Sequence, residues 1–255
     1  MIVNLHTHTP RCRHAGGSEE AYVRCALDAG LQTLGFSDHT PYPFPEGYYS
    51  TFRMFPEELP GYVAAVEDVR RRYAGQLQIH LGVEAEFYPK YFSEMVKMIR
   101  DRGIEYMLLG QHMLYNETEG IGTGGPTADP ALLKQYCDQT IEAMYTGLFT
   151  YFAHPDMMNF VGDEKLYRQE ISRLCRAAKE CDLPLEINLL GLHLQRQYPN
   201  PRFWEIAAEE GCKAVLGVDA HQPEALLDTK TEREARKLAD HFGLNVLDTV
   251  ELRRI

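Results

Sequence analysis

The chain has 255 residues, 44% of them hydrophobic, which is enough for two average domains or for one large α/β barrel with a full core. Its 37 acidic and 26 basic residues give a net charge of −11, and no run of lysine or arginine interrupts this balance. A nucleic-acid partner is therefore disfavoured, because most of the surface would repel a polyanion. A small anionic substrate stays compatible, since bound divalent ions reverse the local field.

Strand-like apolar runs alternate with helix-like amphipathic stretches along the whole chain. The predicted strands are residues 2–6, 33–39, 77–87, 106–113, 150–154, 184–190, 214–221 and a weaker 245–249. The predicted helices are residues 18–29, 61–73, 91–102, 130–146, 164–181, 201–210 and 229–242. Helix starts are marked by the N-cap candidates Ser18, Asp129 and Asn200, and helix ends by Gly30, Gly103 and Gly211.

This regular alternation predicts an α/β fold with a parallel sheet and right-handed crossovers. Seven or eight repeats in 255 residues fit a TIM-like barrel better than an open sheet. No linker, charge block or shift in composition marks a boundary, so we expect residues 1–255 to form a single domain. The longest irregular stretches, residues 40–60 and 115–130, both follow strand ends and are predicted to be substrate lids.

The N-terminal residues MIVNLHTHTP lack the basic and apolar regions of a signal peptide. No apolar run approaches the roughly 18–20 residues that cross a bilayer, so we expect a cytoplasmic protein with no membrane partner. The six cysteines form no CxxC pair and show no regular spacing. We interpret them as reduced thiols.

Metal-type side chains recur at the ends of six of the eight predicted strands. They are His6, His8, His39, Glu84, His112, His154, Asp219 and His221. In the pairs HTH and DAH the two residues alternate, so both point to one side of a strand, and the carboxyl ends of barrel strands converge on one face. Imidazole and carboxylate groups are the usual ligands of Zn, Mn and Fe ions. The pattern predicts a hydrolytic metalloenzyme that holds more than one ion, and it leaves His80, His193 and His241 without a metal role.

The motifs around these residues resemble the PHP (polymerase and histidinol phosphatase) superfamily, and within it the histidinol-phosphatase family. HTHTxxCxHAxG, GFSDHxP, GVEAEFxP, GxH, HPD and GVDAH occur in that order between His6 and His221. The resemblance implies a distorted TIM-like (βα)7 barrel with three divalent metal ions, of Zn, Mn or Fe. It also implies hydrolysis of a small phosphomonoester, L-histidinol phosphate, in histidine biosynthesis.

Carried over motif by motif, the resemblance assigns nine metal ligands. The first ion would be held by His6, His8, Glu84 and Asp219, the second by Glu84, His112 and His154, and the third by His14, His39 and His221. Glu84 would bridge two ions. Cys12 lies between His8 and His14, and we interpret it as a bystander loop thiol, with ligation as the less favoured alternative.

A chemical hypothesis follows from this ligand set, with Glu84 and Asp219 catalytic through the ions they hold. A metal-bridging hydroxide would attack phosphorus in line, and Asp156 or a metal-bound water would protonate the leaving alkoxide. Arg53 and Arg196 are candidate phosphate clamps. Asp38 is a candidate for orienting a ligand imidazole.

The segment INLLGLH, with Leu189, Leu190 and His193, departs from the hydroxyl-rich pattern that the resemblance leads us to expect on the sixth strand. A phosphatase for another small phosphomonoester is therefore the main alternative. An amidohydrolase is disfavoured, because its barrel places a Lys ligand on a middle strand. A polymerase-associated nuclease conflicts with the acidic surface and the absence of a second domain. A non-catalytic metal-binding protein would have closed coordination spheres, whereas nine ligands for three ions leave open positions.

Overall fold

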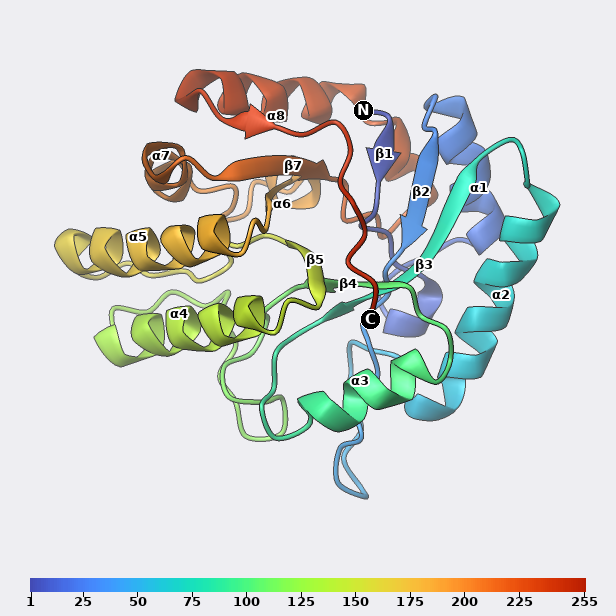
Figure 1. Cartoon of the computed structure of the whole chain (residues 1–255), viewed down its shortest axis with the longest axis horizontal. Helices are drawn as coiled ribbons and strands as arrows, with labels where there is room; N and C mark the ends of the chain where they lie inside the picture. The colour runs from blue at the N-terminus through green and yellow to red at the C-terminus, as the bar shows by residue number, and fades with distance from the viewer.

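Parallel strands and helices alternate along the chain in the computed structural model, which describes residues 1–255 (Figure 1). The strands are β1 (Val3–Asn4), β2 (Thr33–Phe36), β3 (Gln78–Ala85), β4 (Tyr106–Leu109), β5 (Phe149–Phe152), β6 (Leu185–Asn188), β7 (Lys213–Gly217) and β8 (Asn245–Val246). The helices are α1 (Glu19–Asp28), α2 (Leu59–Arg72), α3 (Phe92–Arg100), α4 (Pro130–Tyr145), α5 (Glu164–Glu180), α6 (Leu189–His193), α7 (Pro201–Glu210) and α8 (Thr229–Phe242). Three 3-10 helices join them: η1 (Pro10–Cys12), η2 (Pro56–Glu58) and η3 (Pro223–Leu227).

The eight strands form one parallel sheet in the order of the sequence, and the helices lie around its outside (Figure 1). The sheet curls so far that the chain after β1 meets the chain after β7. Thr7 and Ala220 form a parallel bridge there, and the His8 amide donates to the Ala220 carbonyl at 2.9 Å. β8 pairs only with the start of β7. The predicted parallel α/β, TIM-like architecture is confirmed.

Regular strand structure ends before most of the metal-type side chains, whereas the predicted strands ran through them. His39, His112 and His154 all lie beyond the last residues of β2, β4 and β5. His154 and Asp219 have φ angles of 34° and 54°, which a continuous strand does not contain. The apolar run thus extends further than the regular strand, because the backbone leaves the strand conformation near these side chains.

The predicted helix starts are confirmed by side-chain caps. The side chains of Ser18, Asp129 and Asn200 accept hydrogen bonds from Ala21, Ala131 and Arg202 amides at the starts of α1, α4 and α7. Gly211 ends α7 with a φ of 73°, as predicted. The short helix α6 was not predicted, because its residues were assigned to the sixth strand and its flank. Its cap is Asn188, whose side chain accepts from the Gly191 amide at 2.9 Å.

Two apolar layers hold the barrel together. The larger layer lies between strands and helices and contains 59 buried residues. The smaller one fills the barrel interior with side chains from β4, β5, β7 and the end of β1, including Tyr106, Tyr151 and Val215. Leu247, Val250 and Leu252 of the C-terminal segment pack against this interior layer, and Arg254 bridges to Tyr106. The C-terminal segment therefore covers the amino ends of the strands, and the carboxyl ends stay open.

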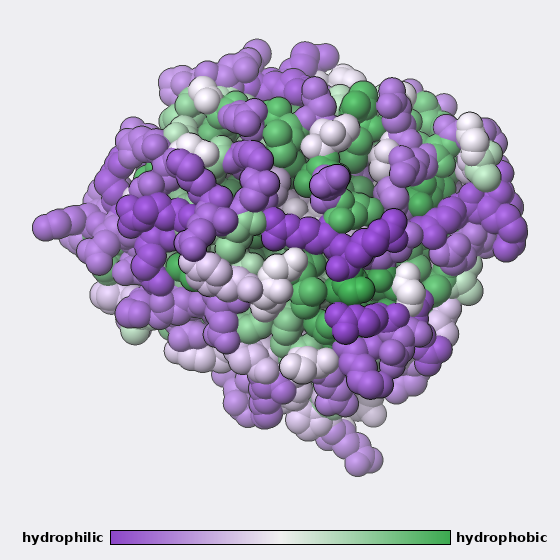
Figure 2. Space-filling view, viewed as in Figure 1, coloured by the Kyte–Doolittle hydropathy of each residue, from purple (hydrophilic) through white to green (hydrophobic).

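The face that the C-terminal segment crosses is mostly hydrophilic toward its edges, with apolar residues showing toward its middle (Figure 2). None of the helices combines the length and the apolar character that crossing a membrane requires.

Candidate metal centre

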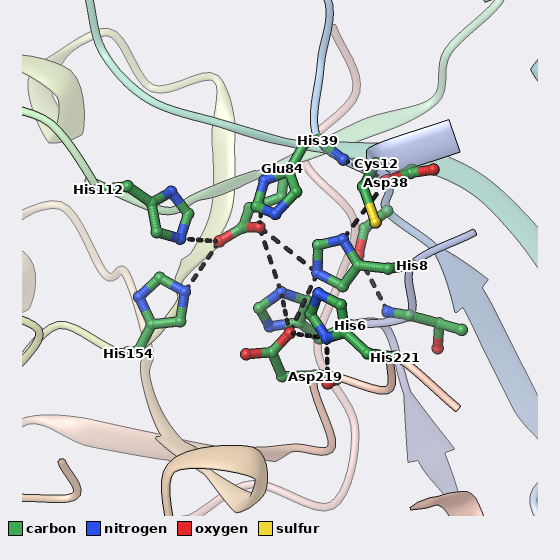
Figure 3. Close-up of polar contacts among 12 residues, drawn as sticks. His6, His8, Cys12, Asp38, His39, Glu84, His112, His154, Asp219 and His221 are labelled. Carbon is green, nitrogen blue, oxygen red and sulfur yellow. Dashed lines mark hydrogen bonds and ion pairs between the residues drawn. The ribbon is translucent and has the colours of Figure 1, made fainter. Parts of the chain in front are cut away.

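The structure brings the nine predicted metal ligands together at the carboxyl end of the barrel. His6 and His8 follow β1, His14 follows η1, and Glu84 lies in β3. The others are His39, His112 and His154, which follow β2, β4 and β5, and Asp219 and His221, which follow β7. Figure 3 labels all the predicted ligands except His14. Several groups of three side chains have candidate ligand atoms within 4.8 Å of one another, and they include His6–His8–Asp219, His6–Glu84–His154 and His14–His39–His221.

Glu84 lies at the centre of this cluster (Figure 3). Its Oε1 lies 2.9 Å from His154 Nε2 and 3.5 Å from His112 Nε2. Its Oε2 lies 3.1 Å from His39 Nδ1 and 3.5 Å from the Nε2 atoms of both His6 and His8. The two oxygens of one carboxylate thus face different sets of imidazoles, which is the arrangement that a bridging ligand needs.

Asp219 forms a second point of convergence, beside the HTH pair. Its Oδ1 lies 3.1 Å from His8 Nε2 and 3.4 Å from His6 Nε2. Its Oδ2 accepts a hydrogen bond from Asn188 Nδ2 at 3.1 Å, which fixes the carboxylate plane. His6 and His8, near the start of the chain, therefore converge with the distant Asp219 on one candidate metal site.

His14 and His221 meet at the outer edge of the cluster. Their Nε2 atoms lie 2.9 Å apart, and their rings stack at 4.6 Å. Each ring turns Nδ1 toward a backbone carbonyl, that of Cys12 for His14 at 2.7 Å and that of Asp219 for His221 at 3.0 Å. The two Nε2 atoms thus lie close enough together to bind one cation.

Several buried nitrogen and oxygen atoms of the cluster have no hydrogen-bond partner. They are His6 Nε2, both ring nitrogens of His8, His39 Nδ1, His154 Nδ1 and Glu84 Oε2. An unpaired buried polar atom is costly, so a cluster of them calls for a ligand that accepts several lone pairs at once. The donor set of imidazoles and carboxylates fits divalent metal ions.

The local charges keep the carboxylates ionised. Burial by itself would raise the pKa of Glu84, but the neighbouring imidazoles, His112 before the others, hold that pKa well below its usual range. Burial likewise opposes ionisation of Asp219, and His6 and His221 hold its pKa well below its usual range. Burial lowers the pKa of His39 well below its usual value, which keeps that imidazole in the neutral form that binds metals.

Three carboxylates lie behind the imidazoles of the cluster, and the sequence pattern pointed to only one of them, Asp38. Glu186 Oε1 lies 2.8 Å from His6 Nδ1, and Glu86 Oε1 lies 3.0 Å from His112 Nδ1. Asp38 Oδ1 lies 3.5 Å from Nδ1 of the His8 ring, and it accepts a hydrogen bond from the backbone amide of its neighbour His39 at 2.8 Å. The contacts of Glu186 and Glu86 each direct an Nε2 lone pair into the cluster. The missed signals were the same-face repeat of Glu84 and Glu86 and a carboxylate inside the buried run 184–190.

A cavity of about 1220 Å³ opens above the cluster. Seven of the nine predicted ligands line it, and His6 and His8 lie beneath. Its remaining walls come mainly from residues 189–198 and 218–234, including Leu189, Leu190, Leu192 and Leu194. Of the predicted lids, residues 40–60 contribute only Phe52 to the cavity lining and residues 115–130 contribute no side chain to it. That segment instead pairs with its neighbours, through Met113–Gly122 and Thr127–Phe160 bridges.

The two predicted phosphate clamps have different surroundings. Arg196 is exposed, lines the cavity and donates to the Tyr198 hydroxyl at 2.7 Å. Arg53 is only 1% exposed and does not line the cavity. Its guanidinium donates to Glu86, Glu117 and the Thr40 carbonyl. The interpretation of Arg53 as a phosphate clamp is corrected, because its donors are already committed to internal acceptors.

Asp156 and Cys12 also differ from expectation. Asp156 does not line the cavity, and its Oδ2 accepts from Trp204 Nε1 at 3.0 Å and the Asn200 amide at 2.6 Å. Burial raises the pKa of Asp156 to about 7, but the position of its carboxyl group does not suit proton donation in the cavity. Cys12 is fully buried and forms a group with His8 and His221, which favours the alternative that it belongs to the cluster.

Sequence comparisons find the same family along most of the chain. The family model described as PHP domain matches residues 4–189. A probable histidinol-phosphatase of Deinococcus radiodurans is 33% identical over 231 residues, which cover 87% of each chain. The histidinol-phosphatase of Bacillus subtilis is 26% identical over 120 residues, 44% of each chain.

Solved structures share the fold. A histidinol phosphate phosphatase from Lactococcus lactis, complexed with zinc, L-histidinol and phosphate, superposes with a TM-score of 0.75 at 18% identity, covering 98% of this chain and 96% of the other. A putative histidinol phosphatase from Listeria monocytogenes gives a TM-score of 0.69 at 19% identity, covering 90% of this chain and 99% of the other.

Proposed function

The chain belongs to the PHP domain family, and from that membership we propose that it is a metal-dependent histidinol-phosphatase, which hydrolyses L-histidinol phosphate to L-histidinol and phosphate in histidine biosynthesis. The substrate assignment is supported by the names of the relatives, which match this chain over most of its length. We propose further that residues 1–255 form one PHP domain.

Three divalent ions, of Zn, Mn or Fe, are proposed to occupy the cluster. The first would be held by His6, His8, Glu84 and Asp219, the second by Glu84, His112 and His154, and the third by His14, His39 and His221. Ions bound there would lower the pKa of water and offset the charge that develops on the phosphoryl oxygens. The unpaired buried nitrogen and oxygen atoms of the cluster support this assignment.

Different side chains of the cavity are proposed to bind different parts of the substrate. Arg196 lines the cavity beside the cluster and is proposed to hold phosphate oxygens. The leucines of residues 189–194 offer an apolar wall for the substrate's carbon chain and ring. Glu224, Asp228 and Glu234 line the same cavity, so the cationic amino group of histidinol phosphate would meet negative charge.

One observation carries the proposal: a carboxylate with two sets of imidazoles around it forms part of the floor of a cavity large enough for a small phosphomonoester. The test is turnover of histidinol phosphate beside a panel of sugar, nucleotide and amino-alcohol phosphates, with the metal-loaded protein. We expect histidinol phosphate to have the highest kcat/KM. A better substrate in the panel would establish the alternative phosphomonoesterase, and no turnover at all would refute a phosphatase.

A further inference from the structure

Arg53 sits in a buried polar hub directly behind the cluster. Its Nη1 and Nη2 donate to the two oxygens of Glu86 at 3.1 and 2.9 Å, and its Nε donates to Glu117 Oε2 at 2.6 Å. The side chains of Arg53, Glu86 and Glu117 are 1%, 1% and 3% exposed. Burying three charged groups is costly, and replacing such a group by apolar residues is often neutral or stabilising, so we looked for a functional contact of these side chains.

The hub reaches a metal-ligand candidate through one atom. Glu86 Oε1, which accepts from Arg53, also lies 3.0 Å from His112 Nδ1. His112 Nε2 then lies 3.5 Å from Glu84 Oε1, inside the cluster. A carboxylate fixed by a two-pronged guanidinium contact can accept only from a protonated Nδ1, which leaves the Nε2 lone pair for a metal.

The net charge of the hub favours a cation at His112 Nε2. One guanidinium faces two carboxylates, so the hub carries a formal excess of one negative charge. An ion at His112 Nε2 would offset this excess across a single imidazole.

Arg53 also supports the aromatic wall of the cavity. Its guanidinium lies 4.4 Å from the Phe52 ring centroid and 5.1 Å from that of Tyr42. Phe52 lines the cavity and meets His39 and His112 edge-on, at centroid distances of 5.6 and 6.2 Å. The hub joins three segments around one ligand: residues 40–60 through Arg53, the end of β3 through Glu86, and the 113–122 loop through Glu117.

We propose that Arg53 is a positioning residue for the second ion: through Glu86 it fixes the ring orientation and tautomer of His112, and it does not contact substrate. The proposal rests on the proposed function only in taking His112 as a ligand.

The test compares Arg53→Lys and Glu86→Gln with the wild type, and Arg70→Lys is the matched control. Arg70 also joins two carboxylates and a backbone carbonyl, Glu67, Glu105 and that of Ile79, but on α2 and far from the cluster. Stepwise zinc dissociation constants are measured by chelator competition. We expect both site variants to weaken one zinc ion about tenfold to a hundredfold, as is typical when a partner of a metal ligand is lost, and to leave the other ions within about threefold.

Two further measurements distinguish the loss of His112 positioning from a general loosening of the metal site. Long-range proton–nitrogen spectra of the zinc-loaded protein should show one imidazole leaving the Nδ1-protonated form in the variants and none in the control. With substrate, kcat should fall while KM changes less than about twofold. Unchanged zinc constants, equal weakening of all the ions, or a rise in KM alone would overturn the proposal.

If Arg53→Lys does not fold, Glu86→Gln carries the same outcomes, because it keeps the size of the side chain and replaces one acceptor oxygen and the negative charge with an amide NH2 group. Zinc binding and the spectra need no substrate. A wild-type protein that binds zinc with these properties but does not hydrolyse histidinol phosphate would refute the proposed function and leave this inference standing.

Discussion

Gly110 lies against the carboxylate of Glu84, so closely that a Cβ built on it would come within 2.6 Å of Glu84 Cδ and 2.7 Å of Cγ. Gly217 has the same relationship to Glu186, with its added Cβ 2.5 Å from Cδ. Each glycine lies at the end of a strand beside a buried carboxylate, and its lack of a side chain leaves room for that carboxylate. The absence of two side chains is therefore part of the construction of the metal centre.

Gly110→Ala is expected to displace Glu84 and to lower kcat at least about a hundredfold, with a stability loss of roughly 1–3 kcal/mol from overpacking. Gly125→Ala is the matched control, since an added Cβ there meets nothing within 4 Å. Steady-state kinetics and thermal unfolding check both variants. Normal activity in Gly110→Ala would show that the carboxylate can shift without consequence.

Glu84→Gln is expected to abolish activity while the fold stays intact. Both oxygens of Glu84 face imidazoles, so two proposed ions would lose a charged ligand at once. Circular dichroism, metal content per chain and kcat are the measurements. Retention of more than about a tenth of kcat would exclude the bridging role.

Glu186→Gln is expected to lower metal affinity or kcat about tenfold to a hundredfold. Glu186 accepts from the His154 amide at 3.0 Å and from Asn188 Nδ2 at 2.9 Å, besides its contact with His6, and an amide cannot accept at both ends. The exposed Glu209, on α7, provides the control Glu209→Gln. Equal metal affinity in the two variants would remove Glu186 from the centre.

Arg196→Ala is expected to raise KM about tenfold to thirtyfold, with kcat within about threefold, because a hydrogen bond to a charged group is worth roughly 1.5–2 kcal/mol. Arg168→Ala is the control, since Arg168 pairs with Glu205 and Glu209 on the surface. A KM equal to that of the wild type would place Arg196 outside the substrate site.

Acid should weaken the contact between β3 and α2. Burial alone would raise the pKa of Glu105, but His80, the Leu81 amide and Arg70 lower it to about 2. A pKa lowered by folding adds stability above the unfolded pKa near 4.5, and this contribution disappears as pH falls toward 2. After discounting for solvent exposure it amounts to about 1–2 kcal/mol.

Urea unfolding of the metal-free protein and of Glu105→Gln checks this pH dependence. The difference in unfolding free energy should be present at pH 7 and should vanish toward pH 2–3, while Glu46→Gln in an exposed loop should show no difference at either pH. A difference that persists in acid would contradict the assignment to ionised Glu105.

The sequence by itself determined the features that depend on local spacing. The one-residue spacing was enough to predict that His6 lies near His8 and Asp219 near His221, although β1 and β7 end before both pairs. The β-then-α alternation predicted the parallel sheet, and Ser18, Asp129 and Asn200 predicted helix starts. These signals are local because backbone geometry repeats over a few residues.

Only the tertiary structure decided which groups stand behind the ligands and which line the cavity. Glu186 meets His6 across 180 residues of sequence, and Arg53 meets Glu117 across 64. Arg53 and Arg196 were both predicted from the sequence to bind phosphate. Arg53 is buried between two carboxylates, whereas Arg196 faces the cavity. Burial and ion pairing depend on where the whole barrel places each side chain, and no local pattern specifies that.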